Sequence, residues 1–80
     1  SVIMGIHVLF FGLLTDATVV SDIYLETVAD TAALKELLIQ QYPLLRTAKY
    51  FIAVNQKMVQ ENTTLKTGDT VALMPPFSGG

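Results

Sequence analysis

The residues that could most clearly take part in a chemical reaction are the last six of the chain, residues 75–80 (PPFSGG). Glycine has no Cβ, so Gly79 and Gly80 would let the backbone enter a narrow channel and would leave the final carbonyl carbon unshielded. The two prolines before them limit the conformations of the segment and reduce the entropy that it loses on binding. One interpretation is therefore that the end of the chain, with the carboxylate of Gly80, is the working part of the protein. The simpler alternative is a disordered end without a function.

The side chains offer no comparable chemistry. The chain has no cysteine, which removes thiolate nucleophiles, disulfides and sulfur-ligated metals together. The single histidine, His7, is expected on the outer side of a strand, without a second ligand or a nucleophile beside it. The carboxylates are interpreted as turn, cap and solvent-facing residues, namely Asp16, Asp22, Asp30, Glu36 and Asp69. We therefore expect no metal site and no catalysis by the domain alone.

Composition narrows the class of protein. With 80 residues the chain is one small domain, and its hydrophobic content of 51% exceeds what so small a core can bury. Some apolar surface should be left exposed, and such a patch usually marks a partner site. A net charge of −2 with only five Lys and Arg gives no footprint for nucleic acid. The apolar run VLFFGLL is too short to span a membrane, and the lack of cysteine suits a cytoplasmic protein.

Alternating hydrophobicity predicts the strands. Residues 6–11 (IHVLFF) should point Ile6, Val8 and Phe10 inward, and a turn at LLTDAT should lead into a second strand over residues 19–26. In the second strand, Ile23 and Leu25 should face inward. Further strands are expected at residues 50–55, 58–60 and 70–74.

One helix is predicted over residues 31–42. Asp30 is a good N-cap, and Pro43 ends the helix because the residue before a proline leaves the α region. Its apolar stripe should consist of Ala33, Leu34, Leu37 and Leu38. One helix on a mixed four- or five-stranded sheet is an α+β arrangement, and this order of elements is that of the β-grasp, or ubiquitin-like, fold. We expect a domain over residues 1–76 and a flexible tail over residues 77–80.

The end of the chain resembles a known family. The segment GDTVALMPPFSGG and the upstream AVNQKMV are similar to the MoaD family, the small subunit of molybdopterin synthase, and also to the thiamine sulfur carrier ThiS. The resemblance runs from about Met4 to Gly80 and includes VLFFG, the capped helix, VNQ before a turn, GD-x-VA and PP-x-x-GG. The proline pair and the chain length favour the molybdopterin branch.

The resemblance implies a reaction at Gly80. A partner enzyme would join the Gly80 carboxylate to AMP from ATP, and a sulfur nucleophile would replace the AMP to give a thiocarboxylate. The thiocarboxylate would then deliver sulfur to a pterin precursor. The implied partners are a MoaE-like large subunit and a MoeB-like adenylyltransferase, which uses the ATP, and the chain itself should bind no cofactor, nucleic acid or membrane. The tail residues expected to thread into these partners are Pro75, Pro76, Phe77, Ser78 and Gly79.

A partner face follows from the pleat of the strands. If Ile6, Val8 and Phe10 face the helix, Phe11 points outward, and Met74 does so at the root of the tail. In the family these positions and Met58 form an apolar patch against the partners, and methionine adapts well to more than one of them. An ordinary half-buried sheet face is the alternative. Some relatives carry an arginine after the first strand, but residues 12–17 contain no cation, so that contact is not carried over.

Two other functions remain open at this point. The chain could serve thiamine thiazole synthesis as a ThiS-like carrier. It could instead be a ubiquitin-like modifier, whose Gly-Gly carboxylate joins a lysine, or a plain interaction module.

Overall fold

A computed structural model describes residues 5–76 of the chain. Within this range five strands and three helical segments follow one another as β1 (Gly5–Phe10), α1 (Leu14–Thr18), β2 (Asp22–Glu26), α2 (Thr31–Gln41), the 3₁₀ helix η1 (Pro43–Arg46), β3 (Phe51–Val54), β4 (Lys57–Val59) and β5 (Thr70–Met74).

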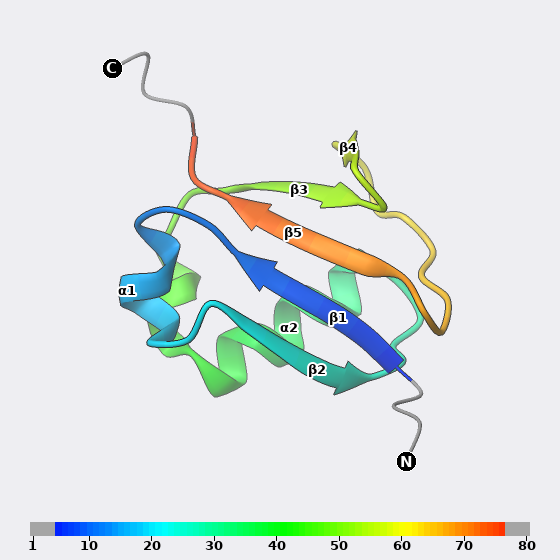
Figure 1. Cartoon of the computed structure of the whole chain (residues 1–80), viewed down its shortest axis with the longest axis horizontal. Coiled ribbons are helices and arrows are strands. Elements are labelled where there is room, and N and C mark those ends of the chain that lie inside the picture. The colour runs from blue at the N-terminus through cyan, green and yellow to red at the C-terminus, as the bar shows by residue number, and fades with distance from the viewer. Residues whose placement is uncertain (1–4, 77–80) are drawn as a thin grey trace.

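The strands form one mixed sheet in the order β2-β1-β5-β3-β4. The first strand pairs antiparallel with β2 and parallel with β5, and β3 is antiparallel to both β5 and β4. Helix α2 crosses one face of this sheet, and the other face carries no helix in the described part of the chain (Figure 1). The predicted α+β, β-grasp fold is therefore confirmed, including the parallel pair of first and last strands.

The inner face of the sheet forms the core with α2. Ile6, Val8 and Phe10 of β1 are at most 2% exposed, and Val71 and Leu73 of β5 are fully buried. Strand β2 contributes the half-buried Ile23 and Leu25, as the alternation predicted. Because side chains alternate along a strand, this burial also fixes which residues point to the outer face.

Helix α2 begins where the sequence predicts and ends one residue earlier than predicted, at Gln41. The Asp30 side chain accepts a hydrogen bond from Ala33 N–H, and Tyr42, before Pro43, has left the helical conformation (φ −130°, ψ 82°). The predicted stripe was wrong in one member, because Ala33 is exposed. The buried leucines Leu34 and Leu38 are joined at the core by Ile39 instead.

The predicted turn at LLTDAT was also wrong, because residues 14–18 form helix α1. Leu14 and Thr18 are buried, so this short segment is held by packing rather than by its own propensity. The Thr18 hydroxyl donates to the carbonyls of Leu14 and Val20, which ties the end of α1 to the following chain. Val19 then adopts a left-handed conformation (φ 70°), so β2 begins only at Asp22.

The N-terminus of α2 is fastened to the loop before β5. Asn62 accepts hydrogen bonds from Ala32 N–H and the Thr31 hydroxyl, and its amide donates to the Asp30 carboxylate. The hydrogen bonds from Ala33 N–H and then from Asn62 lower the pKa of Asp30 below its ordinary value of 3.8. The ionised form of Asp30 is therefore the form that stabilises the fold.

Replacing Asp30 by alanine is expected to lower stability at neutral pH and to flatten the acid limb of the stability curve. Because the pKa is lowered in the folded state, the contribution of Asp30 is present above the unfolded value of 3.8 and is lost as the pH falls through the folded value. Urea unfolding of the unmodified protein and the variant should be measured between neutral and strongly acidic pH. The difference between their free energies of unfolding should narrow as the pH falls below 3.8. Asp16→Ala is the control, and a constant difference at every pH would contradict this role of Asp30.

Candidate partner-binding groove and tail root

The outer face of the sheet carries two apolar rows that run across the strands. In the first row Leu9 lies beside Ala72, Ala72 beside Ala53, and Ala53 beside Met58. The second row lies nearer the end of β5, where Met74 pairs with Phe51. Phe11 joins this row, because its N–H donates to the carbonyl of Leu73.

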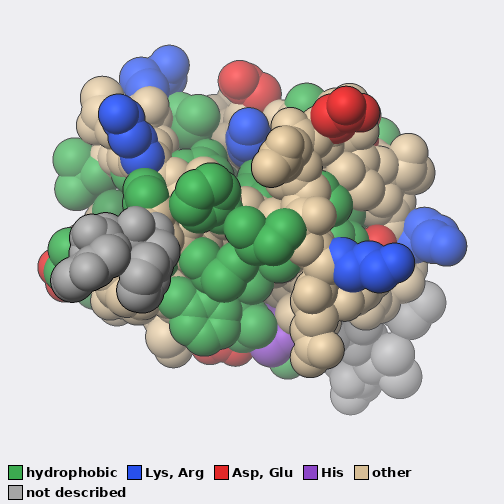
Figure 2. Space-filling view, turned by 90° about the horizontal axis from the view of Figure 1, so that it is seen from above, with side chains coloured by type: hydrophobic (Ala, Val, Ile, Leu, Met, Phe, Trp, Pro, Cys, Tyr) green, Lys and Arg blue, Asp and Glu red, His purple; other side chains and the backbone are tan. Residues whose placement is uncertain are grey.

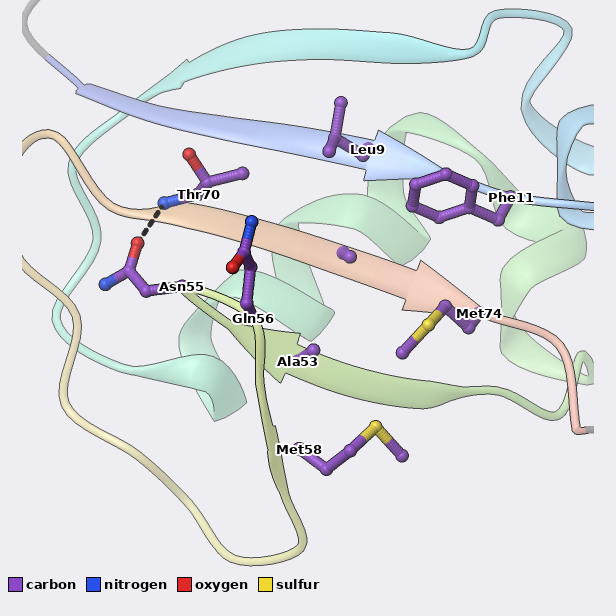
Figure 3. A pocket seen from close by; sticks show the side chains of 9 residues that line it. Leu9, Phe11, Ala53, Asn55, Gln56, Met58, Thr70 and Met74 are labelled. Atoms are coloured by element: carbon purple, nitrogen blue, oxygen red, sulfur yellow. Dashed lines mark hydrogen bonds between the residues drawn. The ribbon is translucent and has the colours of Figure 1, made fainter.

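All members of these rows except Phe51 line a hollow of about 650 Å³, which we call the outer groove. Two small side chains, Ala53 and Ala72, form its floor, while longer side chains stand around them (Figure 3). The full lining is Leu9, Phe11, Ala53, Asn55, Gln56, Met58, Thr70, Ala72 and Met74. Figure 2 shows hydrophobic side chains gathered in a patch, with Lys and Arg side chains above it and to its right, and acidic side chains and the histidine near its lower edge.

The structure brings together the three residues predicted for a partner face. Phe11 and Met58 are 47% and 55% exposed, Met74 is half-buried, and all three line the outer groove. Alternation along β1 and β5 puts Leu9 and Ala72 on the same face as Phe11 and Met74, but these two residues were not predicted as part of the partner face. The same alternation along β3 places Ala53 outward between Ile52 and Val54, whereas Gln56 carried no such signal because it lies in a turn.

The turn between β3 and β4 closes one end of the groove. Both turn residues, Asn55 and Gln56, have positive φ, as in the two-residue hairpin turns that match the twist of a sheet. Asn55 accepts from Thr70 N–H at 3.0 Å and donates its amide to Asp69 at 2.9 Å. These bonds fix the turn against β5.

Asp69 is the second residue that holds the turn between β3 and β4 against β5. Its carboxylate accepts from the Asn55 amide and from the backbone N–H of Lys66. Those two hydrogen bonds, and more weakly the charge of Lys66, lower the pKa of Asp69. The Gly-Asp pair that precedes the last strand thus holds the wall of the groove in place.

The tail leaves the sheet beside the groove. Strand β5 ends at Met74, and Pro75 follows at the same end of the molecule as the connection between β1 and α1 (Figure 1). Gly12, in that connection, has a φ of +59°, and a Cβ on it would lie 2.8 Å from Cγ of Pro75. Only glycine suits both the backbone and the space, so Gly12 allows Pro75 its position. The predicted tail residues Phe77, Ser78, Gly79 and Gly80 lie outside the described residues.

Gly12→Ala is expected to destabilise the fold by about 2 kcal/mol, since it combines a left-handed alanine with a contact against Pro75. Urea unfolding measures the loss. The control is Gly68→Ala, which also has positive φ but leaves nothing within 4 Å of the new Cβ. An equal loss in both variants would show that the backbone conformation alone is responsible and that Pro75 contributes nothing.

The remaining titratable residues form no catalytic group in the part of the chain that the structure describes. His7 Nε2 lies 2.7 Å from a carboxylate oxygen of Asp22, and its ring stacks on Tyr24 with 4.2 Å between centroids. Residues 5–76 contain no cluster of three or more side chains that could hold a metal ion. Nor does any helix among them have the length and apolar character needed to cross a membrane.

The topology defines a ubiquitin-like β-grasp domain, with the outer groove beside its C-terminal strand. The chain belongs to the ThiS family, whose model matches residues 8–80. The fold and the family membership together make the chain a sulfur carrier of the ThiS/MoaD type or a ubiquitin-like modifier.

Solved structures agree with this fold. A Helicobacter pylori complex of subunits 1 and 2 of molybdopterin-converting factor matches with a TM-score of 0.72 and 28% identity, over 94% of this chain and 97% of that one. A Pyrococcus furiosus protein, named as a candidate molybdopterin converting factor subunit 1, has a TM-score of 0.83 at 23% identity, over 90% and 97%. Small archaeal modifier protein 1 from Methanosarcina acetivorans has a TM-score of 0.80 at 21% identity, over 96% and 98%. The last two likenesses concern the fold.

Proposed function

We propose that this chain is the sulfur-carrier small subunit of a molybdopterin synthase. The observation that carries the proposal is the position of the outer groove, whose Phe11 and Met74 lie directly beside the root of the tail at Pro75. A partner that covers the groove would receive the tail at the same end of the sheet. The Helicobacter pylori relative was solved as a complex of two subunits, which supports a large subunit as one partner.

The proposed chemistry takes place at Gly80. Its carboxylate oxygen attacks the α-phosphorus of ATP in the adenylating enzyme, and pyrophosphate leaves. A hydrosulfide ion then attacks the carbonyl carbon, and AMP leaves, which gives a thiocarboxylate. In the large subunit the sulfur passes to the pterin precursor, and water restores the carboxylate. Because loading consumes ATP, we expect the carrier to act in the cytoplasm.

The contribution of this chain is presentation rather than catalysis. The domain supplies a rigid sheet face for docking, and Pro75 and Pro76 restrict the root of the tail before it enters a partner. Gly79 and Gly80 are proposed to pass the narrow part of each active site, with Phe77 and Ser78 between them and the prolines. The catalytic side chains and the bound ATP belong to the partners.

A ThiS-like carrier for thiamine synthesis is the second candidate, and the match to the ThiS family favours it. The first loading steps are the same in both cases, so the acceptor distinguishes them. The loaded protein should be added to the large subunit with the pterin precursor, and separately to a thiazole synthase with its substrates. Formation of the dithiolene pterin alone supports the molybdopterin role, and formation of thiazole alone overturns it.

Intact mass spectrometry tests the carrier chemistry itself. After incubation with an adenylating enzyme, ATP and a sulfur donor, the protein should gain the mass difference between one sulfur and one oxygen atom. A ubiquitin-like modifier would instead form adducts of higher mass with other proteins. Such adducts, without the sulfur-for-oxygen exchange, would contradict the proposal.

A further inference from the structure

Gln56 occupies a backbone conformation that glycine would adopt more easily. Its φ of 72° lies in the left-handed region, where residues with a side chain are uncommon. Two-residue hairpin turns of this kind favour Asn-Gly, with glycine at the position that Gln56 holds. The sequence therefore keeps a strained glutamine where an unstrained residue is available, and such strain often accompanies function.

The side chain of Gln56 faces the outer groove. It contributes to the lining, and Figure 3 shows it extending over the sheet toward β5 rather than away from the domain. Its neighbour Asn55 uses both ends of its amide to bind Thr70 and Asp69. By contrast, the Gln56 carboxamide makes no hydrogen bond within residues 5–76. Within the described residues, the Gln56 amide therefore does not stabilise the fold of the domain by a hydrogen bond.

The groove has an apolar part and a polar end. Ala53 and Ala72 leave room for an apolar side chain from another molecule, while Gln56 and Thr70 stand at one end. A carboxamide both donates and accepts hydrogen bonds, which matches the N–H and C=O of a peptide backbone. A polypeptide segment with one bulky apolar residue would satisfy both parts at once.

We propose that Gln56 is a recognition residue for the partner's main chain. Its carboxamide hydrogen-bonds a backbone group of a partner segment whose apolar side chain packs over Ala53 and Ala72. The inference rests on the proposed function, because the partner is the adenylating enzyme that loads Gly80. That enzyme is required whichever acceptor finally receives the sulfur.

Three variants separate recognition from strain. Gln56→Ala removes the amide but keeps a residue with a side chain in the left-handed conformation. The KM for the carrier in sulfur loading should therefore rise about 10-fold, while kcat and Tm stay unchanged. Gln56→Gly should raise the KM equally and also raise Tm by about 4 °C, because the strain is relieved. Val19→Gly is the matched control. Val19 also has a left-handed backbone and is 87% exposed, but it does not line the groove, so Tm should rise and the KM should stay unchanged.

A variant of the groove, Phe11→Arg, distinguishes failure of the role proposed for Gln56 from failure of the groove as the docking site. If Phe11→Arg raises the KM while both Gln56 variants load as the unmodified protein does, the role of Gln56 is overturned and the groove assignment stands. If only Gln56→Gly raises the KM, the cause is turn flexibility and the inference is again overturned. If Phe11→Arg also loads normally, the groove is not the docking site and both proposals about it fail.

Discussion

Deletion of Gly80 is expected to abolish sulfur loading while the fold stays intact. The shortened chain still ends in a carboxylate, but the reacting carbon stops about 3.5 Å short of its place in the adenylating enzyme. Since a misplacement of about 1 Å can cost about 100-fold in rate, loading should fall by at least that factor. Intact mass spectrometry after a timed incubation measures the loaded fraction.

The control for this deletion preserves the length of the tail. Ser78→Ala leaves two terminal glycines and the same number of residues, so it should load at nearly the unmodified rate. Thermal unfolding should be unchanged in both variants, because the last buried core residue of the described range is Leu73 in β5. Sulfur loading by the protein that lacks Gly80 would refute the assignment of the reactive carboxylate.

Introducing a positive charge into the outer groove is expected to weaken binding of the large subunit by about 100-fold, equivalent to about 3 kcal/mol. Phe11→Arg and Met74→Arg each place a guanidinium where the partner's apolar surface would otherwise exclude water, and an unpaired buried charge is costly. Calorimetric titration of the large subunit into each variant measures the change in Kd, and co-purification gives a simpler readout.

Leu44→Arg is the matched control for these substitutions. Leu44 is 65% exposed and lies in η1, and it does not line the groove. The same change of residue type there should leave the Kd unchanged. Equal weakening in all three variants would indicate a general charge effect rather than a docking site.

Much of the fold could be predicted because burial repeats with a fixed period. The alternation in β1 identified Ile6, Val8 and Phe10 as core residues, and the N-cap Asp30 with Pro43 bounded α2 almost to the residue. The parallel pairing of β1 with β5 came from knowledge of the fold, since no local pattern encodes which distant strands meet.

The errors lie where tertiary contacts override local preference. Asp16 and the threonines around it favour a turn, but the buried Leu14 and the hydroxyl bonds of Thr18 hold a short helix there. Val19 and Val20 are typical strand residues, yet Val19 takes the left-handed conformation that ends this helix. A single sequence does not show which of these tendencies the packed core selects.

The candidate site was predictable in part for the same reason. Outward alternation placed Phe11 and Met74 on one face, and the structure confirms that they share the groove with Met58. The closeness of Gly12 to Pro75 had no signal in the sequence, because it arises from two segments far apart along the chain. The predicted boundary between domain and tail, and the roles of residues 77–80, stay predictions.

The outer groove is one continuous hollow beside one tail. If the adenylating enzyme and the large subunit both use it, neither can bind while the other is in place. The carrier must then leave the first enzyme completely before it reaches the second, so its throughput depends on how quickly each complex dissociates. Tighter attachment to either enzyme would slow the cycle, and selection should favour moderate affinity over maximal affinity at this surface.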